Sequence, residues 1–213
     1  MVRKKNRIVY HLGHGIPLKN IGLAENNIPA LRKINRNIRL RLFTHVTCYS
    51  EFFMPVLSNA FRNKSAVYLK LGQPRNDSLI NYTQQHPDVL SKNVSENKIL
   101  YSPTWRSYAD THFFPFTDMC VQKLHDFLEK TNSIIYLRAH PYYPAIIDER
   151  LYASSRVVYL GSDIITDITP HLDCFNVLVT DYSSIFLDFY ALNEKSVIFV
   201  PYDFDKYDDL DGY

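Results

Sequence analysis

The chain has few cysteines, no long apolar run and no signal-peptide pattern in its first residues, and each shortage argues against a class of protein. Its three cysteines, Cys48, Cys120 and Cys174, include no Cys-x-x-Cys pair. This argues against a disulfide framework or a structural zinc site and fits a reducing cytoplasm. No apolar run approaches the roughly 20 residues that a membrane-spanning helix needs. The basic N-terminus also lacks the apolar core that follows in a signal peptide.

Net charge is also in short supply. The formal value of +2 is too small to indicate a nucleic-acid partner. Lysine and arginine gather at residues 3–7 and 32–41, and a solvent-exposed face is the ordinary interpretation of both clusters. In the second cluster Leu31, Ile34, Ile38 and Leu42 recur near helical spacing, so this segment can instead lie on an anionic membrane surface. Any membrane contact is therefore expected to be peripheral.

The chain does have enough apolar residues for a core, at 46% hydrophobic against 22% charged. From about residue 98 onward, short apolar runs alternate with polar turns and helical segments. This alternation predicts an α/β fold with a Rossmann-like parallel sheet covered by helices. The predicted strands are residues 99–101, 134–137, 157–160, 177–179 and 197–200, and the predicted helices are residues 118–130, with Thr117 as cap, and 184–192.

The first third of the chain is less regular. It predicts strands at residues 8–10, 44–47 and 67–71 and a helix at residues 51–61. Residues 86–97 are the most linker-like stretch, because Pro, Ser, Asn and charged residues gather there. That stretch does not mark a clear boundary, so residues 1–213 are interpreted as one domain.

Residues 181–188 are the most informative segment and read Asp-Tyr-Ser-Ser-Ile-Phe-Leu-Asp after the apolar residues 176–180. They predict a strand, a hydroxyl-rich turn and the start of a helix. Helix N–H groups and the positive end of the helix dipole attract an anion at the carboxyl edge of a parallel sheet. Ser183 and Ser184 would add hydroxyl donors there. An ordinary helix cap is the alternative, because Asp and Ser are favoured at caps whatever the function.

Four further motifs accompany this segment. They are His-Gly-Ile-Pro-Leu-Lys at 14–19, Gly-Gln-Pro-Arg-Asn-Asp at 72–77, Ile-Leu-Tyr-Ser-Pro-Thr-Trp-Arg at 99–106 and Leu-Arg-Ala-His-Pro at 137–141. In order and approximate spacing the chain resembles the CDP-glycerol glycerophosphotransferase family of teichoic-acid primases and polymerases. The closing residues 197–213 also have the character of that family.

The resemblance implies a fold and a reaction. The fold is the C-terminal nucleotide-binding half of a GT-B arrangement, here incomplete and without the N-terminal acceptor-side domain. The reaction moves glycerol phosphate, or a related polyol phosphate, from CDP-glycerol to an acceptor hydroxyl with release of CMP, in the synthesis of teichoic acid or a capsule-like polymer. The implied partners are CDP-glycerol, a polyol-phosphate or lipid-linked acceptor and, at the inner face of the cell membrane, a lipid surface. No cofactor and no metal are expected.

The resemblance also implies a set of site residues. The catalytic candidates are His14 and His140, and the donor-binding candidates are Gly15, Ile16, Pro17, Leu18, Arg75, Pro103, Thr104, Arg138, Ala139, Ser183, Ser184 and Asp188. A neutral imidazole at His14, with an ordinary pKa of about 6.5, suits a general base that takes the proton of the attacking hydroxyl. Arginines, serine hydroxyls and a helix N-terminus suit a diphosphate.

Each of these residues also has an ordinary structural interpretation. Either histidine can make a backbone hydrogen bond in a turn or at a strand end. Arg75 can be a surface turn residue, Thr104 a turn hydroxyl and Asp188 a solvent-facing helix acid. Two other functions remain open on the same residues, namely a non-catalytic nucleotide-binding remnant and a GT-B glycosyltransferase that uses a nucleotide sugar.

The chain departs from the family pattern at three positions. Ile16 stands where the family usually has Thr, Gly13 replaces a usual Trp, and Gln73 replaces a usual aromatic residue. None of these changes removes a charged or titratable group. Donor binding is therefore expected to persist.

Overall fold

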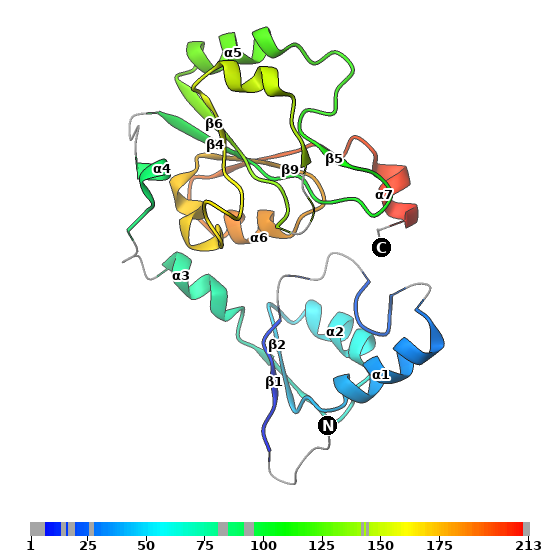
Figure 1. Cartoon of the computed structure of the whole chain (residues 1–213). Coiled ribbons are helices and arrows are strands. Elements are labelled where there is room, and N and C mark those ends of the chain that lie inside the picture. Colours follow the sequence, from blue (N-terminus) through cyan, green and yellow to red (C-terminus); the bar gives the residue numbers. More distant parts are fainter. Residues whose placement is uncertain are drawn as a thin grey trace. The chain divides into compact units, whose positions relative to one another are not determined.

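The computed structural model describes residues 7–13, 16, 20–25, 28–80, 85–91, 96–141, 143 and 145–210. The chain divides into two compact units, unit 1 with Met1–Asp77 and Gly212–Tyr213 and unit 2 with Ser78–Asp211 (Figure 1). Each unit has its own parallel sheet. That residues 1–213 serve as one nucleotide-binding domain stays a prediction.

The main sheet of unit 2 has five parallel strands. They are β4 (Asn97–Tyr101), β6 (Ser133–Leu137), β8 (Val157–Tyr159), β9 (Val177–Thr180) and β10 (Ser196–Phe199). Counted first to fifth along the chain, these strands lie in the order 3-2-1-4-5 from β8 to β10. This is the order of a doubly wound sheet, with its switch point between β4 and β9. The predicted Rossmann-like sheet is confirmed.

Strand β6 shows why the sheet is covered on both faces. All five of its residues are buried, and successive side chains of a strand point to opposite faces. Ile134 and Tyr136 belong to one hydrophobic cluster and Ile135 and Leu137 to another. A parallel sheet buried on both faces is expected to contain such continuous apolar runs.

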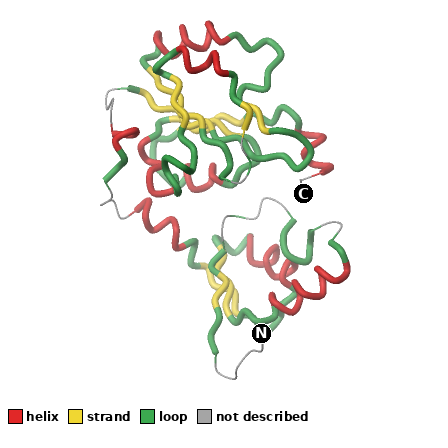
Figure 2. The backbone as a smooth tube through the Cα atoms, in the orientation of Figure 1, coloured by secondary structure: helices red, strands yellow, loops and turns green. Residues whose placement is uncertain are grey.

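Helices supply the two covering layers. Leu128 of α5 (Val121–Lys130) packs in the same cluster as Ile135, whereas Phe189 of α6 (Ile185–Tyr190) packs in the cluster of Ile134. Figure 2 shows these helices on opposite sides of the strands. The other elements of unit 2 are α3 (Asp77–Ile80) at its boundary, α4 (Asp88–Ser91), α7 (Phe204–Leu210), the 3-10 helices η2 (Glu149–Ala153) and η3 (Thr169–Cys174), and the short strands β5 (Thr111–His112) and β7 (Ala145–Ile146).

Two predicted helix boundaries differ from the structure. Helix α5 begins at Val121, with Cys120 in the cap position in an extended conformation (φ −120°, ψ 108°), so the expectation of Thr117 as the cap was wrong. Residues 117 and 118 lie in a turn instead. Helix α6 is shorter at both ends than the predicted 184–192.

Unit 1 holds a smaller parallel sheet in the order β1–β2–β3. Its strands are β1 (Tyr10–His11), β2 (His45–Cys48) and β3 (Val67–Lys70), and its helices are α1 (Ala30–Leu40), α2 (Phe53–Phe61) and the 3-10 helix η1 (Pro74–Asn76). Val46 and Cys48 of the central strand pack with Leu57 and Phe61 of α2. Among the described residues, no helix is long and apolar enough to cross a membrane.

Candidate functional site

The carboxyl ends of β4 and β9 bring two predicted motifs together. The strands pair from Ile99 with Val177 to Tyr101 with Val179. Beyond the paired residues, the backbone N–H of Thr104 donates to Asp181 Oδ1 at 2.8 Å. Because ligands of open α/β sheets bind outside the carboxyl ends at the switch point, this edge of unit 2 is the candidate site.

Thr104 presents a hydroxyl at this edge. Its Oγ1 atom is buried and has no hydrogen-bond partner among the described residues. The preceding Pro103 is buried as well. Since buried polar atoms are normally hydrogen-bonded, the Thr104 hydroxyl is suited to a ligand atom.

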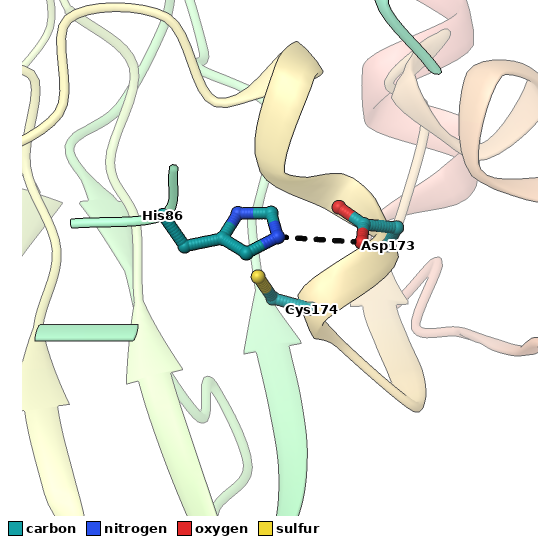
Figure 3. A group of neighbouring side chains, drawn as sticks. All are labelled: His86, Asp173 and Cys174. Carbon is teal, nitrogen blue, oxygen red and sulfur yellow. Dashed lines mark ion pairs between the residues drawn. The ribbon is translucent and has the colours of Figure 1, made fainter. Parts of the chain in front are cut away.

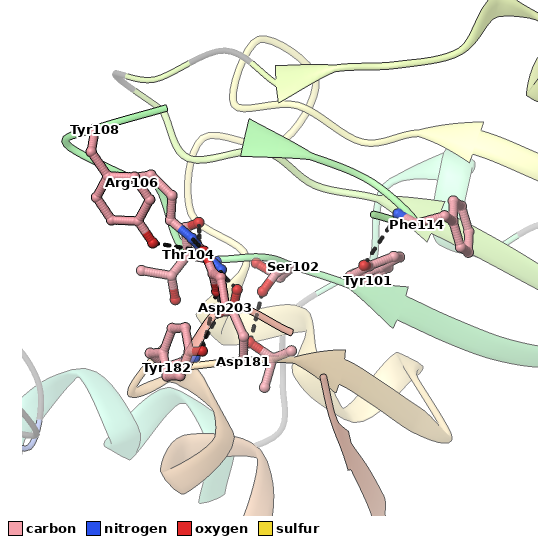
Figure 4. Close-up of polar contacts among 10 residues, drawn as sticks. Tyr101, Ser102, Thr104, Arg106, Tyr108, Phe114, Asp181, Tyr182 and Asp203 are labelled. Carbon is pink, nitrogen blue, oxygen red and sulfur yellow. Dashed lines mark hydrogen bonds and ion pairs between the residues drawn. The ribbon is translucent and has the colours of Figure 1, made fainter. Parts of the chain in front are cut away.

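A buried arginine organises the same edge and was not assigned a role from the sequence. The side chain of Arg106 is 1% exposed and lies 2.9 Å from Asp181 Oδ2. Its Nε and Nη2 atoms donate to the two carboxylate oxygens of Asp203, each at 2.9 Å. Nη1 also donates to the carbonyl oxygen of Thr104 (Figure 4). One guanidinium thus joins the loops that follow β4, β9 and β10.

Tyrosines complete this cluster. Tyr108 and Tyr182 donate their hydroxyls to Asp203 at 2.6 and 3.2 Å, and the ring of Tyr182 stacks on that of Tyr207 at 3.8 Å. Burial alone would raise the pKa of Asp203, but hydrogen bonds from Arg106 and both tyrosines hold it below its usual value. Burial, together with the Asp203 carboxylate, raises the pKa of both Tyr108 and Tyr182. Asp203 therefore stays ionised, and the tyrosines stay neutral donors.

At the helix start of residues 183–185, one serine makes a cap hydrogen bond and the other makes none. Ser183 Oγ accepts from the backbone N–H of Ile185 at 3.4 Å, which is a long cap hydrogen bond. Ser184 occupies the cap position without a side-chain cap hydrogen bond. Asp188 is 3% exposed, so the alternative of a solvent-facing helix acid was wrong.

Arg138 has a visible structural task. Nη1 donates to the carbonyl oxygens of Leu160, Gly161 and Ile165 at 3.1, 3.4 and 2.9 Å, and Nη2 donates to that of Thr166 at 3.2 Å. Burial lowers the pKa of Arg138. The neighbouring Ala139 is also buried. These bonds engage both terminal nitrogens of Arg138, which argues against a direct contact with a phosphate. The role of Arg138 in donor binding stays a prediction.

His140 lies in an aromatic group that links the loops after β4 and β6. Tyr143 stacks on Trp105, with ring centroids 4.3 Å apart, and His140 lies 5.3 Å from Tyr143 and 6.3 Å from Trp105. Burial lowers the pKa of His140, which favours the neutral imidazole. A neutral imidazole can donate or accept a hydrogen bond at this edge.

The remaining candidates belong to unit 1. Arg75 lies half-buried in η1, and Ile16 is half-buried as well. His14, Gly15, Pro17 and Leu18 lie outside the described residues. The catalytic role of His14 and the contacts of its neighbours therefore stay predictions.

A further polar group lies away from this edge. Ligand atoms of His86, Asp173 and Cys174 lie within 4.8 Å of one another, and His86 Nε2 is 3.6 Å from Asp173 Oδ2 (Figure 3). His86 Nδ1 also lies 3.1 Å from His171 Nδ1. Burial raises the pKa of the Cys174 thiol to about 11, so the thiol is protonated in the metal-free protein at neutral pH. These contacts attach residues 85–91 to η3, and the absence of a metal stays a prediction.

Comparison with known proteins identifies the family. Residues 1–213 match the model of the family described as CDP-Glycerol:Poly(glycerophosphate) glycerophosphotransferase. The chain belongs to this family. It is 28% identical over 222 aligned residues to the teichoic acid glycerol-phosphate transferase of Staphylococcus aureus. This alignment covers 94% of the chain and 54% of that protein. It is 29% identical over 226 residues to the teichoic acid poly(glycerol phosphate) polymerase of Bacillus subtilis, over 94% of the chain and 28% of that protein.

The fold agrees with a solved relative. A structure of the wall teichoic acid polymerase TagF with CDPG superposes with a TM-score of 0.74 at 24% identity, over 97% of the chain and 53% of that structure. The expected GT-B-like α/β fold is thereby confirmed. The chain spans about half the length, or less, of these relatives.

Proposed function

We propose that the protein transfers glycerol phosphate, or a related polyol phosphate, from CDP-glycerol to an acceptor hydroxyl with release of CMP. The observation that carries the proposal is the family match over all 213 residues. The geometry of unit 2 supports it, because the Thr104 loop and the Ser183 turn meet at the switch point of a doubly wound sheet. The relatives act in teichoic-acid synthesis by name, and the polymer made here is proposed to be of that kind.

The reaction needs positioning and charge stabilisation more than covalent chemistry. The acceptor oxygen forms a bond to the distal phosphorus while the bond from that phosphorus to the bridging oxygen breaks, and CMP leaves with the bonding electrons. We assign the removal of the acceptor proton to His14. Thr104, Ser183 and Ser184 are assigned to the donor phosphates, and no metal or further cofactor is assigned.

Arg106 has a positioning role in this proposal. It faces two carboxylates, Asp181 and Asp203, so it brings no surplus positive charge to a diphosphate. It does hold the carbonyl of Thr104, while Asp181 holds the Thr104 N–H. The cluster therefore fixes the backbone that presents the Thr104 hydroxyl.

Calorimetric titration tests the donor assignment directly. The full-length protein is expected to bind CDP-glycerol or CDP more tightly than ADP or a UDP-sugar, and to release CMP when an acceptor is added. Stronger binding of a UDP-sugar would move the assignment to a glycosyltransferase. Binding without CMP release would support a non-catalytic nucleotide-binding remnant.

We also propose peripheral contact with an anionic membrane through α1. Leu31, Ile34 and Ile38 of this helix are 78%, 60% and 54% exposed, and Arg32 and Lys33 lie on the same helix. An exposed apolar stripe with basic flanks suits the headgroup region of a bilayer. The protein is expected to sediment with vesicles that contain phosphatidylglycerol and much less with pure phosphatidylcholine. Equal recovery with both, or with neither, would contradict the proposal.

A further inference from the structure

Unit 1 contains a buried side-chain amide, that of Gln73. Gln73 is 6% exposed, and within the part of the chain that the structure describes neither its Nε2 nor its Oε1 atom has a hydrogen-bond partner. Native proteins rarely keep such a group without a reason, and an absent ligand is one of the ordinary reasons. The Gln73 amide can therefore bind a ligand group.

Gln73 lies where a parallel sheet binds its ligands. Gln73 follows β3 and Gly72, and it is the N-cap residue of η1. Strands β1, β2 and β3 are parallel, so their carboxyl ends share one edge of the sheet. Ligands of parallel α/β sheets bind at that edge.

The amide lies against the backbone of Gly13, which follows β1 at the same edge. A Cβ atom at Gly13 would lie 2.8 Å from Gln73 Nε2, and the φ of +76° at Gly13 is strained for any other residue. The N–H of Gly13 donates to His11 Nδ1 at 3.2 Å, which fixes this segment. The absence of a side chain at Gly13 thus leaves room for the Gln73 amide.

A second buried acceptor belongs to the same turn. Asn76 Oδ1 is buried without a hydrogen-bond partner among the described residues, and the Asn76 N–H donates to the carbonyl oxygen of Gln73 at 3.0 Å. Whichever way the Gln73 amide is turned, it offers one acceptor and one donor group. The turn therefore presents two side-chain acceptors as well as a donor.

This combination selects between the two parts of a polyol-phosphate substrate. Ionised phosphate oxygens only accept hydrogen bonds, so they leave the two acceptors unpaired. A hydroxyl group both donates and accepts, and a polyol carries several hydroxyls at neighbouring carbons. The buried acceptors therefore match polyol hydroxyls better than phosphate.

We propose that Gln73, with Asn76, binds the hydroxyls of a polyol and is a specificity-determining residue of the transfer reaction. The proposal rests on the function proposed above and names the part of the substrate that this turn recognises. The polyol can be the glycerol of the donor or the terminal unit of the acceptor, and the two sources are separated by experiment.

The test compares Gln73→Leu with the control Gln122→Leu in the full-length protein. Gln122 is an exposed glutamine on α5 whose amide donates to Asp126. If the donor glycerol binds at Gln73, Gln73→Leu weakens CDP-glycerol about tenfold and leaves CDP unchanged. If the acceptor binds there, the affinities for CDP-glycerol and for CDP both stay constant, and the KM for a glycerol-phosphate acceptor rises about tenfold. Gln122→Leu is expected to change neither quantity.

The unfolding temperature and the NMR signal of the Gln73 amide distinguish a failure of this proposal from a failure of the proposed function. Because no described residue pairs with the Gln73 amide, Gln73→Leu is expected to leave the unfolding temperature unchanged or higher. Unchanged affinity for both substrates would overturn the proposal. If the wild-type protein binds neither CDP-glycerol nor CDP, the proposed function fails. The NMR signal of the Gln73 side-chain amide then decides, because a saturable shift with added glycerol supports polyol binding and no shift overturns it.

Discussion

The carboxyl edges of the two sheets differ in whether their buried polar side chains have partners. In unit 2, Arg106 is bonded to Asp181 and Asp203, and the carboxylate of Asp203 receives two tyrosine hydroxyls as well. In unit 1, the amide of Gln73 is buried and finds no hydrogen-bond partner in the described ranges of the chain. The charged cluster of the first edge is satisfied by the protein itself, whereas the Gln73 amide at the second edge has no partner among the described residues.

The difference has a physical consequence for each edge. A satisfied network is rigid, and removing one member leaves charges unpaired in a buried place. An unsatisfied amide costs stability in the free protein, and its removal relieves that cost. Substitution of Arg106 should therefore lower stability, whereas Gln73→Leu should leave it unchanged or raise it. The following experiments examine the unit 2 side of this contrast.

The largest effect is expected from Arg106→Met. The change leaves Asp181 and Asp203 without their cation, and breaking a buried ion pair costs about 3–5 kcal/mol in the free energy of unfolding. Urea denaturation monitors the loss. The control is Arg150→Met, since Arg150 pairs with Asp148 on the surface with its side chain 79% exposed, and little change is expected there. A wild-type denaturation midpoint for Arg106→Met would show that the cluster does not hold the edge together.

Arg138→Met is expected to have the next largest effect. It removes hydrogen bonds to the carbonyl oxygens of residues 160–166 and should cost about 2–3 kcal/mol, because bonds to charged groups are strong. Where the variant is still folded, its CDP-glycerol affinity should be close to that of the wild type. A large loss of affinity with normal stability would instead restore Arg138 as a phosphate ligand.

Local patterns predicted most of the sheet of unit 2. Apolar runs such as residues 134–137 and 177–179 contain enough β-branched and aromatic residues to identify strands, and β6 and β9 each extend them by one residue. The meeting of Thr104 with Asp181 agrees with the rule that the carboxyl ends of parallel strands share an edge. These features depend on short stretches of sequence.

Long-range pairing was not predictable in the same way. Arg106 and Asp203 are 97 residues apart, and nothing in composition or spacing joins them. The burial of Asp188 and the carbonyl contacts of Arg138 likewise depend on how loops fold back over the sheet. The two-residue strands β5 and β7 are too short for a periodic signal.

Thr104→Val separates binding from stability at the edge of unit 2. Valine has nearly the same shape as threonine, and the hydroxyl it removes has no partner among the described residues. The free energy of unfolding should therefore change by less than about 1 kcal/mol. CDP-glycerol affinity should fall about tenfold, the loss of one good hydrogen bond to a phosphate oxygen. If titration shows full affinity for the variant, the Thr104 hydroxyl is not a donor ligand.

The smallest expected effect is a pH dependence of unit 2 that arises away from both edges. Burial lowers the pKa of His86 and of His171, and the nearby Lys98 lowers that of His86 further. In the unfolded chain both imidazoles titrate at about pH 6.5. Below that pH the unfolded state binds more protons than the folded state, so stability falls on acidification until the lower folded pKa values are passed. Burial raises the pKa of Asp173, which works in the opposite direction at lower pH.

Denaturation midpoints at pH 7.5 and pH 5.5 measure this dependence. His171→Gln removes one of the two imidazoles whose pKa is lowered by burial and should reduce the difference between the two midpoints. His112→Gln is the matched control, because His112 is exposed on β5, and the difference should stay as in the wild type. An equal pH dependence in all three proteins would place its origin elsewhere, and Asp203 is then the next group to test, because its lowered pKa also makes acid destabilising.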